Sequence, residues 1–600
     1  MKQILSKNST SFVAFFLFVA MHTAFAQSKI TANLQADLAK NATVNCLVVM
    51  REQADLTAAN ALPTKEEKGW YTYNTLTQTA ERSQKAVKTL LTTENVQFQA
   101  FWVVNALHIE SANAALLQKV AALAEVAEIM PDAEMSLHTP TKAEDEPANR
   151  IVLPTNNMLA ATTTWGIAKI KADQVWQLGF TGTNVVVGGQ DTGYKWDIPT
   201  IKDKYRGWNG ATADHNFNWH DAIHVRDTHY VSENPFGYDL LEPIDDQQHG
   251  THTMGTMVGS KDDMNTDIGV APNAKWIGCR DMERGWGKPS TYIECFQWFI
   301  APTNLQNAAA DPTKAPHVIN NSWGCPPSEG CDASNFSVMN AVIRNVKAAG
   351  IFVTVSAGNS GSSCSSVNNP AAMFEPSFSV GATDSVDDIA GFSSRGPVTV
   401  DGSNRRKPNV SAPGVNVRSC TPDGSFQNWA GTSMAGPHVA GAVALIISAR
   451  PSLAGQVDLI ENILEQTAEH ILTNENCGTD NATSMPNNVH GFGRIDVLRA
   501  VQSALSVVVA TENQNNKAAF ANIIPNPAQN DATLQIKGID GNTTLEIVNT
   551  AGQLLHSEQF YATNNVFNKT IDFTNFNNGV YFYTIYNNTQ KISGKVVVAK

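Results

Sequence analysis

Residues 184–193 have the sequence NVVVGGQDTG, and this stretch decides the fold of the central part of the chain. Residues 185–187 are a β-branched run of the kind that is buried on both faces of a parallel sheet. Similar runs recur at residues 318–319 and 352–355, with helix-like patterns between them. The alternation predicts that residues 151–506 form an α/β fold, a doubly wound, mainly parallel sheet with helices on both faces.

Three segments of this region carry residues that could act together in catalysis. Asp191 ends the first buried run, and parallel sheets place their sites at such strand ends. His249 begins a helix of small residues (HGTHTMGTMVG), and Ser433 lies where another helix begins (GTSMAGPH). A serine hydroxyl needs a neighbouring base, histidine can be that base near neutral pH, and a buried carboxylate fixes the imidazole tautomer. The three segments together predict acyl transfer through a serine nucleophile.

Each residue alone also has a structural interpretation. Asp-Thr-Gly is a common turn, His249 could simply start a helix, and Ser433 could be an N-cap. A lipase or esterase would need Gly-x-Ser-x-Gly, but Ala435 occupies the last position. A zinc protease would need His-Glu-x-x-His, and His249 with His252 has neither the glutamate nor the spacing. We assign His252 and His438 to packing.

A set of motifs in chain order makes the catalytic interpretation specific. They are QDTG (190–193), HGTHTMGTMVG (249–259), VINNSWG (318–324), SAGN (356–359), FSSRGP (392–397), SAPGV (411–415) and GTSMAGPHVAG (431–441). With them, residues 160–505 resemble the subtilisin-type (peptidase S8) serine proteases, and more narrowly the bacillopeptidase F-like branch. The resemblance implies that Asp191 orients the imidazole, His249 is the base and Ser433 is the nucleophile.

The same resemblance implies the supporting residues of the site. An amide at Asn359, after the run 352–355, could donate to a developing oxyanion, together with the N–H of Ser433. Ser322, Trp323 and Gly324 would pair with an extended polypeptide substrate. No cofactor is expected for the chemistry, and structural calcium is an option that many relatives use. The acidic loop candidates for calcium are better interpreted as solvated surface charges: Asp245, Asp262, Asp263 and Asp267.

The N-terminal 150 residues divide into two parts. Residues 1–26 have basic lysines, an apolar run at 12–21 and Ala24-Phe25-Ala26, the layout of a secretory signal peptide. A membrane anchor is the alternative, but ten apolar residues are too few to span a bilayer. Residues 27–150 show the pattern β-α-β-β-α-β, which suggests a ferredoxin-like unit. This unit resembles the inhibitory propeptide of the family, with cleavage near residues 131–160, and a retained N-terminal domain is the alternative.

The C-terminal part has a different sequence pattern from the parallel-sheet region. Residues 507–519 are a polar linker, and residues 520–600 are short alternating runs typical of a small all-β sandwich. The latter resemble the type IX secretion sorting domain through PNP (525–527), Gly552, NGVY (578–581), Lys591 and GKVV (594–597). That implies the type IX secretion machinery as a partner and a secreted or cell-surface protein. A sandwich that binds carbohydrate or protein is the alternative.

Composition sets outer limits on this interpretation. The formal net charge of −13 argues against a nucleic-acid binder, and 42% hydrophobic residues exclude wholesale disorder. After the signal segment we expect no stable membrane span. Of eight cysteines, Cys279 with Cys295 and Cys325 with Cys331 are candidate pairs, and seven after residue 150 leave at least one free.

The sequence therefore predicts a secreted serine endopeptidase made as a signal–propeptide–protease–sorting-domain precursor. Two alternatives remain open: a non-catalytic surface or adhesion protein on a protease scaffold, and a processing protease with one dedicated target. The residue preference around the scissile bond cannot be predicted from these motifs.

Overall fold

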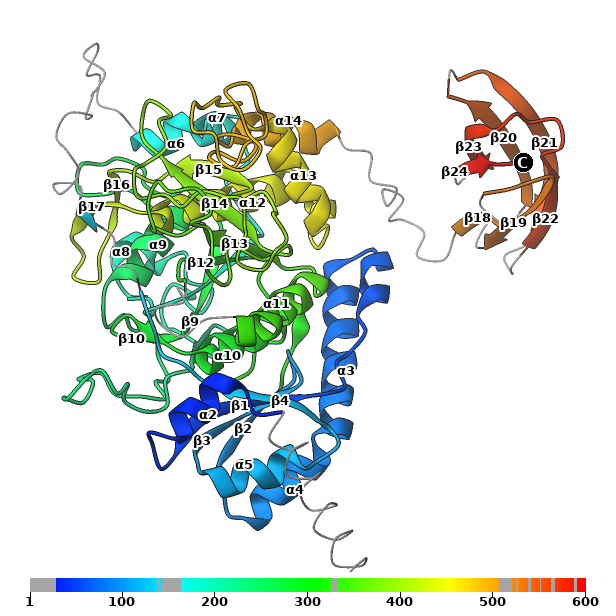
Figure 1. Cartoon of the computed structure of the whole chain (residues 1–600). Coiled ribbons are helices and arrows are strands. Elements are labelled where there is room, and N and C mark those ends of the chain that lie inside the picture. Colours follow the sequence, from blue (N-terminus) through cyan, green and yellow to red (C-terminus); the bar gives the residue numbers. More distant parts are fainter. Residues whose placement is uncertain are drawn as a thin grey trace, which may run out of the picture. The chain divides into compact units, whose positions relative to one another are not determined.

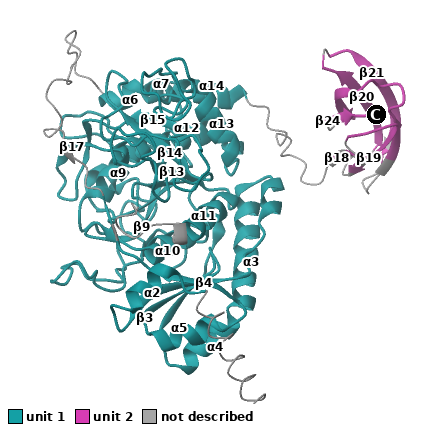
Figure 2. Cartoon of the chain, viewed as in Figure 1, with its two compact units in different colours: residues 1–506 teal, residues 507–600 magenta. Residues whose placement is uncertain are grey.

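The computed structural model divides the chain into two compact units, residues 1–506 and 507–600, coloured teal and magenta in Figure 2. The structure describes residues 29–137, 141–142, 163–324, 333–506, 520–524, 527–537, 541–550, 552–562, 567–587 and 591–600. The predicted signal peptide, the 507–519 linker and the Cys325–Cys331 pair lie outside these residues.

A seven-stranded parallel sheet forms the centre of the first unit (Figure 1), as predicted. Its strand order is β15-β14-β13-β12-β7-β9-β8. The strands are β7 (Val186–Asp191), β8 (Trp219–Asp221), β9 (Lys275–Arg280), β12 (Val318–Asn321), β13 (Phe352–Ser356), β14 (Phe378–Thr383) and β15 (Val410–Pro413). After β7 the chain adds β8 and β9 to the sheet on one side of β7, and it later adds β12 on the other side. The carboxyl ends of β7 and β12 therefore flank the point where the strand order reverses, which is where open α/β sheets place their sites.

Helices cover both faces of this sheet, and adjacent glycines in β7 show which helix faces which side. A Cβ on Gly188 would meet Phe299 of α10, and one on Gly189 would meet Met254 of α9. The long helices are α9 (His249–Val258), α10 (Pro289–Ile300), α11 (Ala333–Ala348), α12 (Thr432–Ala449), α13 (Val457–Thr467) and α14 (Val497–Ser506). The short ones are α6 (Trp165–Lys169), α7 (Ala172–Gln177), α8 (Pro199–Lys202), η4 (Pro312–Lys314) and η6 (Pro451–Leu453).

Helix α12 is the one described helix long and apolar enough to cross a membrane, but 94% of that window is buried inside the protein. It packs against β12, β13, β14 and β15 of the sheet. It is thus a central core helix, and small residues such as Gly436 and Gly441 let its neighbours approach closely.

The N-terminal segment forms a four-stranded antiparallel sheet of order β2-β3-β1-β4. Its strands are β1 (Val44–Met50), β2 (Phe98–Phe101), β3 (Ala106–Ala112) and β4 (Val126–Pro131), and its helices are α2 (Ala32–Leu38), η1 (Thr57–Ala61), α3 (Lys65–Ser83), α4 (Lys85–Thr93) and α5 (Ala114–Ala121). The first helix of the predicted β-α-β-β-α-β order is in fact two helices, which meet at Gln84. The Gln84 amide, turned inward, donates to the carbonyl oxygen of Phe101 (2.7 Å) and ties the junction to the sheet.

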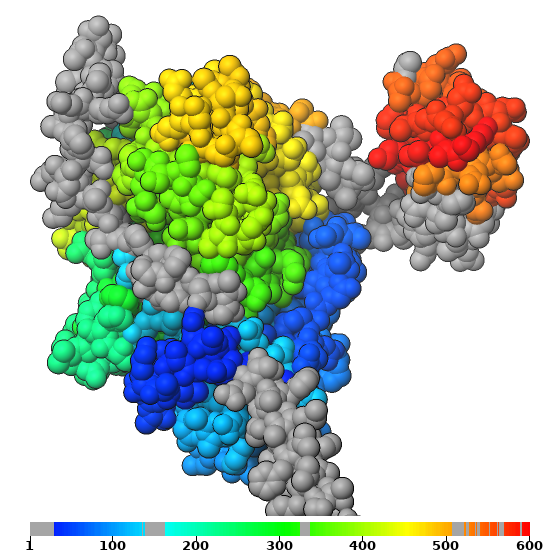
Figure 3. All heavy atoms as spheres, in the orientation of Figure 1, coloured from blue at the N-terminus to red at the C-terminus, as the bar shows by residue number. Residues whose placement is uncertain are grey.

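The two faces of this small sheet have different partners. Cys46 and Val48 of β1 pack with α4 and α5, whereas Leu47 between them joins the core that contains α10 and α11. Figure 3 shows the N-terminal segment, in blue, lying directly against the green part of the first unit. The N-terminal segment and the region of the parallel sheet therefore share one apolar core, and separating them would expose a large apolar area.

Two further small sheets in the first unit join distant segments. β5 (Met135–Ser136) pairs with β11 (Trp286–Gly287), which pairs with β10 (Met282–Glu283). β6 (Thr141–Lys142) pairs with β17 (Phe426–Ala430), which pairs with β16 (Val417–Cys420). In both sheets, residues that follow the N-terminal domain form an edge strand on the region of the parallel sheet.

Two disulfides are present among the described cysteines. The predicted bond Cys279–Cys295 links β9 to α10, and Cys364–Cys477 closes a separation of 113 residues. Cys46 and Cys420 are free and buried, so one cysteine after residue 150 is unpaired, as the odd count predicted.

The second unit is all-β, as predicted. Its two antiparallel sheets have the orders β18-β19-β22 and β21-β20-β23-β24. The strands are β18 (Phe520–Ile524), β19 (Asp531–Lys537), β20 (Gly541–Asn549), β21 (Leu554–Ala562), β22 (Phe567–Asp572), β23 (Gly579–Tyr586) and β24 (Lys591–Val598). Leu534 from one sheet and Ile547 and Ile585 from the other belong to one buried cluster, so the two sheets enclose a common core.

Candidate active site

Asp191 is the last residue of β7 and is fully buried. Its Oδ1 accepts a hydrogen bond from the N–H of Thr192 at 2.8 Å. Because β7 is flanked on both sides by hydrogen-bonded strands, the carboxylate is fixed at the sheet edge where the strand order reverses. A buried, oriented carboxylate at this position is suited to hold a second polar group in one geometry.

His249 is that second group. It is the first residue of α9, and its Nδ1 lies 2.7 Å from Oδ1 and 2.9 Å from Oδ2 of Asp191. The preceding Gln248 has φ 104°, a left-handed conformation that turns the chain sharply into the helix. With the Nδ1 proton donated to Asp191, the lone pair of the imidazole is on Nε2. That atom is buried and has no hydrogen-bond partner in the described part of the chain, so it is free to accept a proton.

Asp245 ties the two groups together, which the sequence did not indicate. Its carboxylate accepts from Thr192 Oγ1 (2.8 Å), from the N–H groups of Gln247 (3.0 Å) and Gln248 (2.8 Å), and from the N–H (2.8 Å) and hydroxyl (2.6 Å) of Thr251. Burial raises the pKa of Asp245, and these hydrogen bonds oppose the rise. The carboxylate caps the start of α9 and holds the turn after Asp191.

Ser433 is the second residue of α12 and is nearly fully buried. Its hydroxyl donates to the carbonyl oxygen of Ser322 at 3.2 Å, and no hydrogen bond joins it to His249 among the described residues. Active-site hydrogen bonds in structures without substrate are often long or misaligned and tighten when substrate binds. The N-terminal end of α12 also favours negative charge, because its first N–H groups have no partners within the helix.

Asn359 lies beside Ser433 and is oriented by Thr432. Its Oδ1 accepts from the N–H (2.9 Å) and the hydroxyl (2.8 Å) of Thr432. Because these two hydrogen bonds hold Oδ1 against Thr432, the Nδ2 donor points away from Thr432. Asn359, Ser433 and Ser322 line one small cavity of about 20 Å³, enough for a single water molecule. The site thus has a donor, a hydroxyl and a backbone carbonyl facing the same small space.

The stretch of Ser322, Trp323 and Gly324 follows β12 at the same edge of the sheet. The Trp323 ring is buried and stacks on Tyr292 with ring centres 3.8 Å apart. The Ser322 hydroxyl donates to the Ser433 carbonyl oxygen at 3.2 Å. The side chains of Ser322 and Trp323 therefore make contacts within the protein. The stretch itself lines the cavity beside Ser433.

The structure corrects our interpretation of the acidic loop residues. Asp245 and Asp262 are buried rather than solvated, the first at the start of α9 and the second paired with Arg418 at 2.7 Å. Asp263 is exposed, as expected, and also pairs with Arg418. Sequence could not separate the buried carboxylates from the solvated one, because their hydrogen-bond donors come from the local backbone and from a distant arginine.

The other two histidines near the motifs lie in the core. His252 stacks on Trp429 with ring centres 4.3 Å apart, and burial lowers its pKa to about 3. His438 donates from Nδ1 to the carbonyl oxygen of Met434 (2.8 Å), and burial lowers its pKa to about 4. Both imidazoles are neutral at ordinary pH and serve packing.

Thr192, Asp245 and Thr432 are the supporting residues that sequence reasoning missed. Two of them stand directly beside predicted site residues, in QDTG and GTSMAG, and a threonine next to a catalytic residue was the available signal. Asp245 has no such signal, because it lies four residues before His249 in an irregular loop.

Comparison with known proteins shows which families the chain matches. The family model described as "Subtilase family" matches residues 182–493, and "Secretion system C-terminal sorting domain" matches residues 522–599. Bacillopeptidase F of Bacillus subtilis (strain 168) is 33% identical over 516 residues, 81% of this chain and 33% of that protein. Subtilisin DY of Bacillus licheniformis is 33% identical over 315 residues, 52% of this chain and 93% of that protein.

The chain spans about a third of the length of Bacillopeptidase F but nearly all of Subtilisin DY. The sorting-domain match indicates a secreted or cell-surface protein. The family match covers 52% of the chain, including every motif of the predicted site. The chain therefore belongs to the subtilase family of serine proteases and carries a C-terminal secretion sorting domain.

Proposed function

We propose that this protein is a secreted serine endopeptidase that forms an acyl-enzyme on Ser433 and removes its own N-terminal segment. The observation that carries the proposal is the path of that segment. β5 (Met135–Ser136) adds to the edge strand β11, and β6 (Thr141–Lys142) adds to β17. The chain is thus held on both sides of the site in the manner of an extended peptide substrate.

The bond to be cut lies between Leu137 and Thr141. The N–H of Leu137 donates to the carbonyl oxygen of Gly285 at 2.6 Å, and Thr141 pairs with Ala430, three residues before Ser433. Four peptide bonds join these two anchors, and they can span at most about 14 Å when fully extended. This narrows the expected cleavage region of 131–160 to four peptide bonds.

The chemistry follows from the geometry of the triad. The Ser433 hydroxyl leaves the Ser322 carbonyl oxygen, gives its proton to Nε2 of His249 and bonds to the carbonyl carbon of the scissile peptide. Asp191 stabilises the imidazolium through Nδ1–H, and the Asn359 amide with the Ser433 N–H stabilises the oxyanion. His249 then protonates the leaving amine as the C–N bond breaks, and a water molecule hydrolyses the ester in the reverse sequence. No step needs a cofactor.

The N-terminal segment fits the role of an inhibitory propeptide with a ferredoxin-like fold. Its β-α-β-β-α-β order and antiparallel strand order β4-β1-β3-β2 support that fold. Asp132 accepts from the N–H (2.9 Å) and hydroxyl (2.6 Å) of Ser290 and so caps α10 of the protease region. Gln297 of the same helix accepts from the N–H groups of Trp102 (2.6 Å) and Val103 (3.2 Å). With these polar contacts and the shared apolar core, a cleaved segment would stay bound and block the site.

The test is the intact mass and N-terminal sequence of the secreted protein, wild type beside Ser433→Ala. Ser506→Ala, at the exposed end of α14, is the matched control. We expect wild type and the control to begin between residues 138 and 141, and Ser433→Ala to keep its N-terminal segment. Identical trimming of all three would mean that another protease matures the chain. No trimming, with no turnover of unfolded protein, would favour the non-catalytic scaffold.

We also propose that the C-terminal unit directs export through the type IX secretion machinery. The match to the sorting domain over residues 522–599 supports this role. In a host that has this machinery, deletion of residues 520–600 should leave folded, active enzyme inside the cell envelope. Unchanged release into the medium would contradict the role of the sorting domain.

A further inference from the structure

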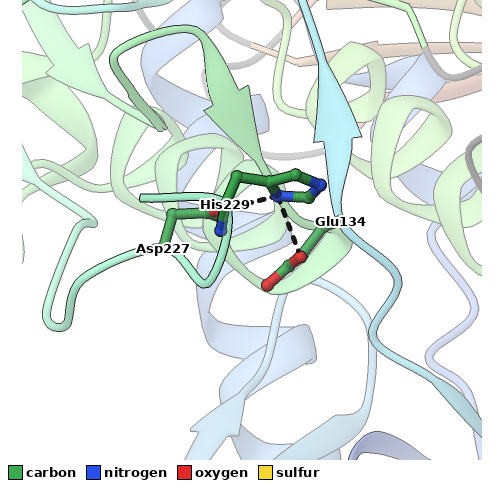
Figure 4. Close-up of side chains that lie close together, drawn as sticks. All are labelled: Glu134, Asp227 and His229. Carbon is green, nitrogen blue, oxygen red and sulfur yellow. Dashed lines mark hydrogen bonds and ion pairs between the residues drawn. The ribbon is translucent and has the colours of Figure 1, made fainter. Parts of the chain in front are cut away.

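Glu134, Asp227 and His229 converge beside the point where the N-terminal segment pairs with β11. Each offers one ligand atom, and these atoms lie within 4.8 Å of one another. Figure 4 shows the His229 ring between the two carboxylates, with Nδ1 2.9 Å from Asp227 Oδ1 and 3.1 Å from Glu134 Oε2. Glu134 belongs to the N-terminal segment, and the other two belong to a loop of the protease region.

We propose that these three side chains bind one divalent metal ion of the zinc type, and that the ion clamps the uncleaved N-terminal segment to the protease region. Imidazole nitrogen and carboxylate oxygen are ligands that Zn²⁺ takes at about 2.0–2.2 Å, with three protein ligands and water in open sites. The two nitrogen–oxygen pairs, 2.9 and 3.1 Å apart, would subtend roughly 80–100° at such an ion, so the ligands would have to spread by a few tenths of an ångström to reach the tetrahedral angle of about 109°.

The surrounding residues hold the three ligands in place. The His229 ring stacks on Trp286 with centres 3.4 Å apart, which fixes its orientation. The Thr228 hydroxyl lies 2.8 Å from each Glu134 oxygen, and Lys288 Nζ lies 3.5 Å from Oε1. The N–H of Asp227 donates to Glu283 at 2.5 Å. Partners of this kind, which orient ligands without touching the metal, are typical of functional metal sites.

A cavity adjoins the cluster at Asp227, which is the member of the three proposed ligands that lines it. Its volume is about 420 Å³, and Asp227, Glu283, Trp286 and Lys288 line it on the protease side. Gln99 and His108 line it from the N-terminal segment. The cavity opens at the same seam between segment and protease that the ion would bridge.

The position of the cluster gives the ion a specific role. Ser136, two residues after Glu134, pairs with Trp286, the residue on which His229 stacks. An ion would therefore join the segment to the protease loop directly before the edge pairing that leads into the cleft. Once the cleaved segment has left, only two ligands remain, so tight binding would be confined to the precursor and the cleaved but undissociated complex.

Metal binding itself does not depend on catalysis, whereas the effect on release rests on the proposed self-processing. Binding is therefore measured on untagged full-length Ser433→Ala, which cannot process itself, by Zn²⁺ titration calorimetry and by the visible spectrum of its Co²⁺ form. Glu134→Gln and His229→Gln remove ligands in this background. Glu233→Gln removes an exposed carboxylate of the same loop and is the matched control.

We expect Ser433→Ala and the Glu233→Gln control to bind one Zn²⁺ that Glu134→Gln and His229→Gln bind at least tenfold more weakly. The change must occur with unaltered circular dichroism. Equal Zn²⁺ affinity in all four proteins, or no binding, would overturn the proposal and leave the cluster as three hydrogen-bonded side chains without an ion.

The role of the ion is tested on the wild-type protein. Saturating Zn²⁺ should slow dissociation of the cleaved segment at least tenfold, and the effect should be absent in Glu134→Gln. Equal release rates with and without Zn²⁺ would overturn the clamp. A wild-type chain that binds Zn²⁺ but is never cleaved would refute self-processing and leave the metal site standing.

Discussion

Replacing Asp245 by asparagine should damage both the stability of the protease region and its catalytic geometry. The Asp245 carboxylate accepts five hydrogen bonds, from a residue beside Asp191, from the two residues that precede α9 and from the first turn of that helix. Asparagine has nearly the same shape, but its NH2 group faces donors wherever it is placed. On the Oδ2 side it meets the N–H and hydroxyl of Thr251, and on the Oδ1 side it meets three donors.

The magnitude follows from this count. At least two hydrogen bonds to a charged acceptor are lost, and each is worth about 1.5–3 kcal/mol, so the expected destabilisation is about 3–6 kcal/mol. For a cooperative unit of roughly 350 residues, the unfolding entropy is about 0.7 kcal/mol/K, so the melting temperature should fall by about 4–8 °C. Because Asp245 also positions the turn that carries His249, we expect turnover to fall at least tenfold.

The assay is thermal unfolding of the full chain in the Ser433→Ala background, where no processing changes the sample. Turnover of a peptide substrate is measured separately with Ser433 intact. Asp263→Asn is the control, since this carboxylate is exposed and its pair with Arg418 is worth about 0–1 kcal/mol. If Asp245→Asn melts within 1 °C of the control and turns over substrate equally fast, the carboxylate does not hold the site and our reasoning fails.

Three further predictions address the oxyanion donor, pH and the disulfide framework. Thr432→Val should lower kcat by up to about 10²-fold with little change in KM, which is less than the roughly 10²–10³-fold known for complete loss of an oxyanion donor in subtilisin, whereas Thr432→Ser should retain activity. Burial, followed by the charges of nearby cationic residues, lowers the pKa of His317 to about 3. The unfolded chain therefore gains a proton that the folded chain lacks, and stability should fall as pH drops from about 6.5, by about 1.4 kcal/mol per pH unit for this group. His317→Gln should make that pH dependence shallower by one proton, and an identical slope would refute the assignment. Cys364→Ala with Cys477→Ala should destabilise by about 2–5 kcal/mol in chemical denaturation, because the bond closes a long loop in the unfolded chain; an unchanged midpoint would show that the bond is dispensable.

The parallel sheet could be predicted because its strands are buried on both faces. Runs such as residues 352–355 consist of aromatic and β-branched residues, and their spacing from helical stretches leaves little choice of architecture. Asp191 and His249 could be paired for the same reason: one ends a strand and the other starts a helix at the edge where sites form. Their contact at 2.7 Å follows from topology as much as from the motifs.

The supporting contacts were beyond sequence reasoning because they join segments with no local pattern. Asp245 is one acidic residue among several in an irregular loop, and only the folded backbone shows which N–H groups point at it. The Cys364–Cys477 bond spans 113 residues, and several pairings were consistent with the count. The break between α3 and α4 at Gln84 is likewise set by a tertiary hydrogen bond to Phe101, since nothing in the local sequence stops a helix there.

The strands β5 and β6 show most clearly why the function could not be derived from the sequence alone. Each has two residues, too few for any periodic signal, and each forms only by pairing with a distant edge. Backbone pairing of this kind asks little of the side chains, so it can be used by the chain's own segment first and by other polypeptides later. The shared apolar core and the polar contacts on α10 hold the N-terminal segment more firmly than this edge pairing does. Selective occupation of the site therefore depends on the folded N-terminal domain rather than on the residues at the scissile bond, and a short peptide with the sequence of residues 133–142 should inhibit the enzyme far more weakly than the intact segment.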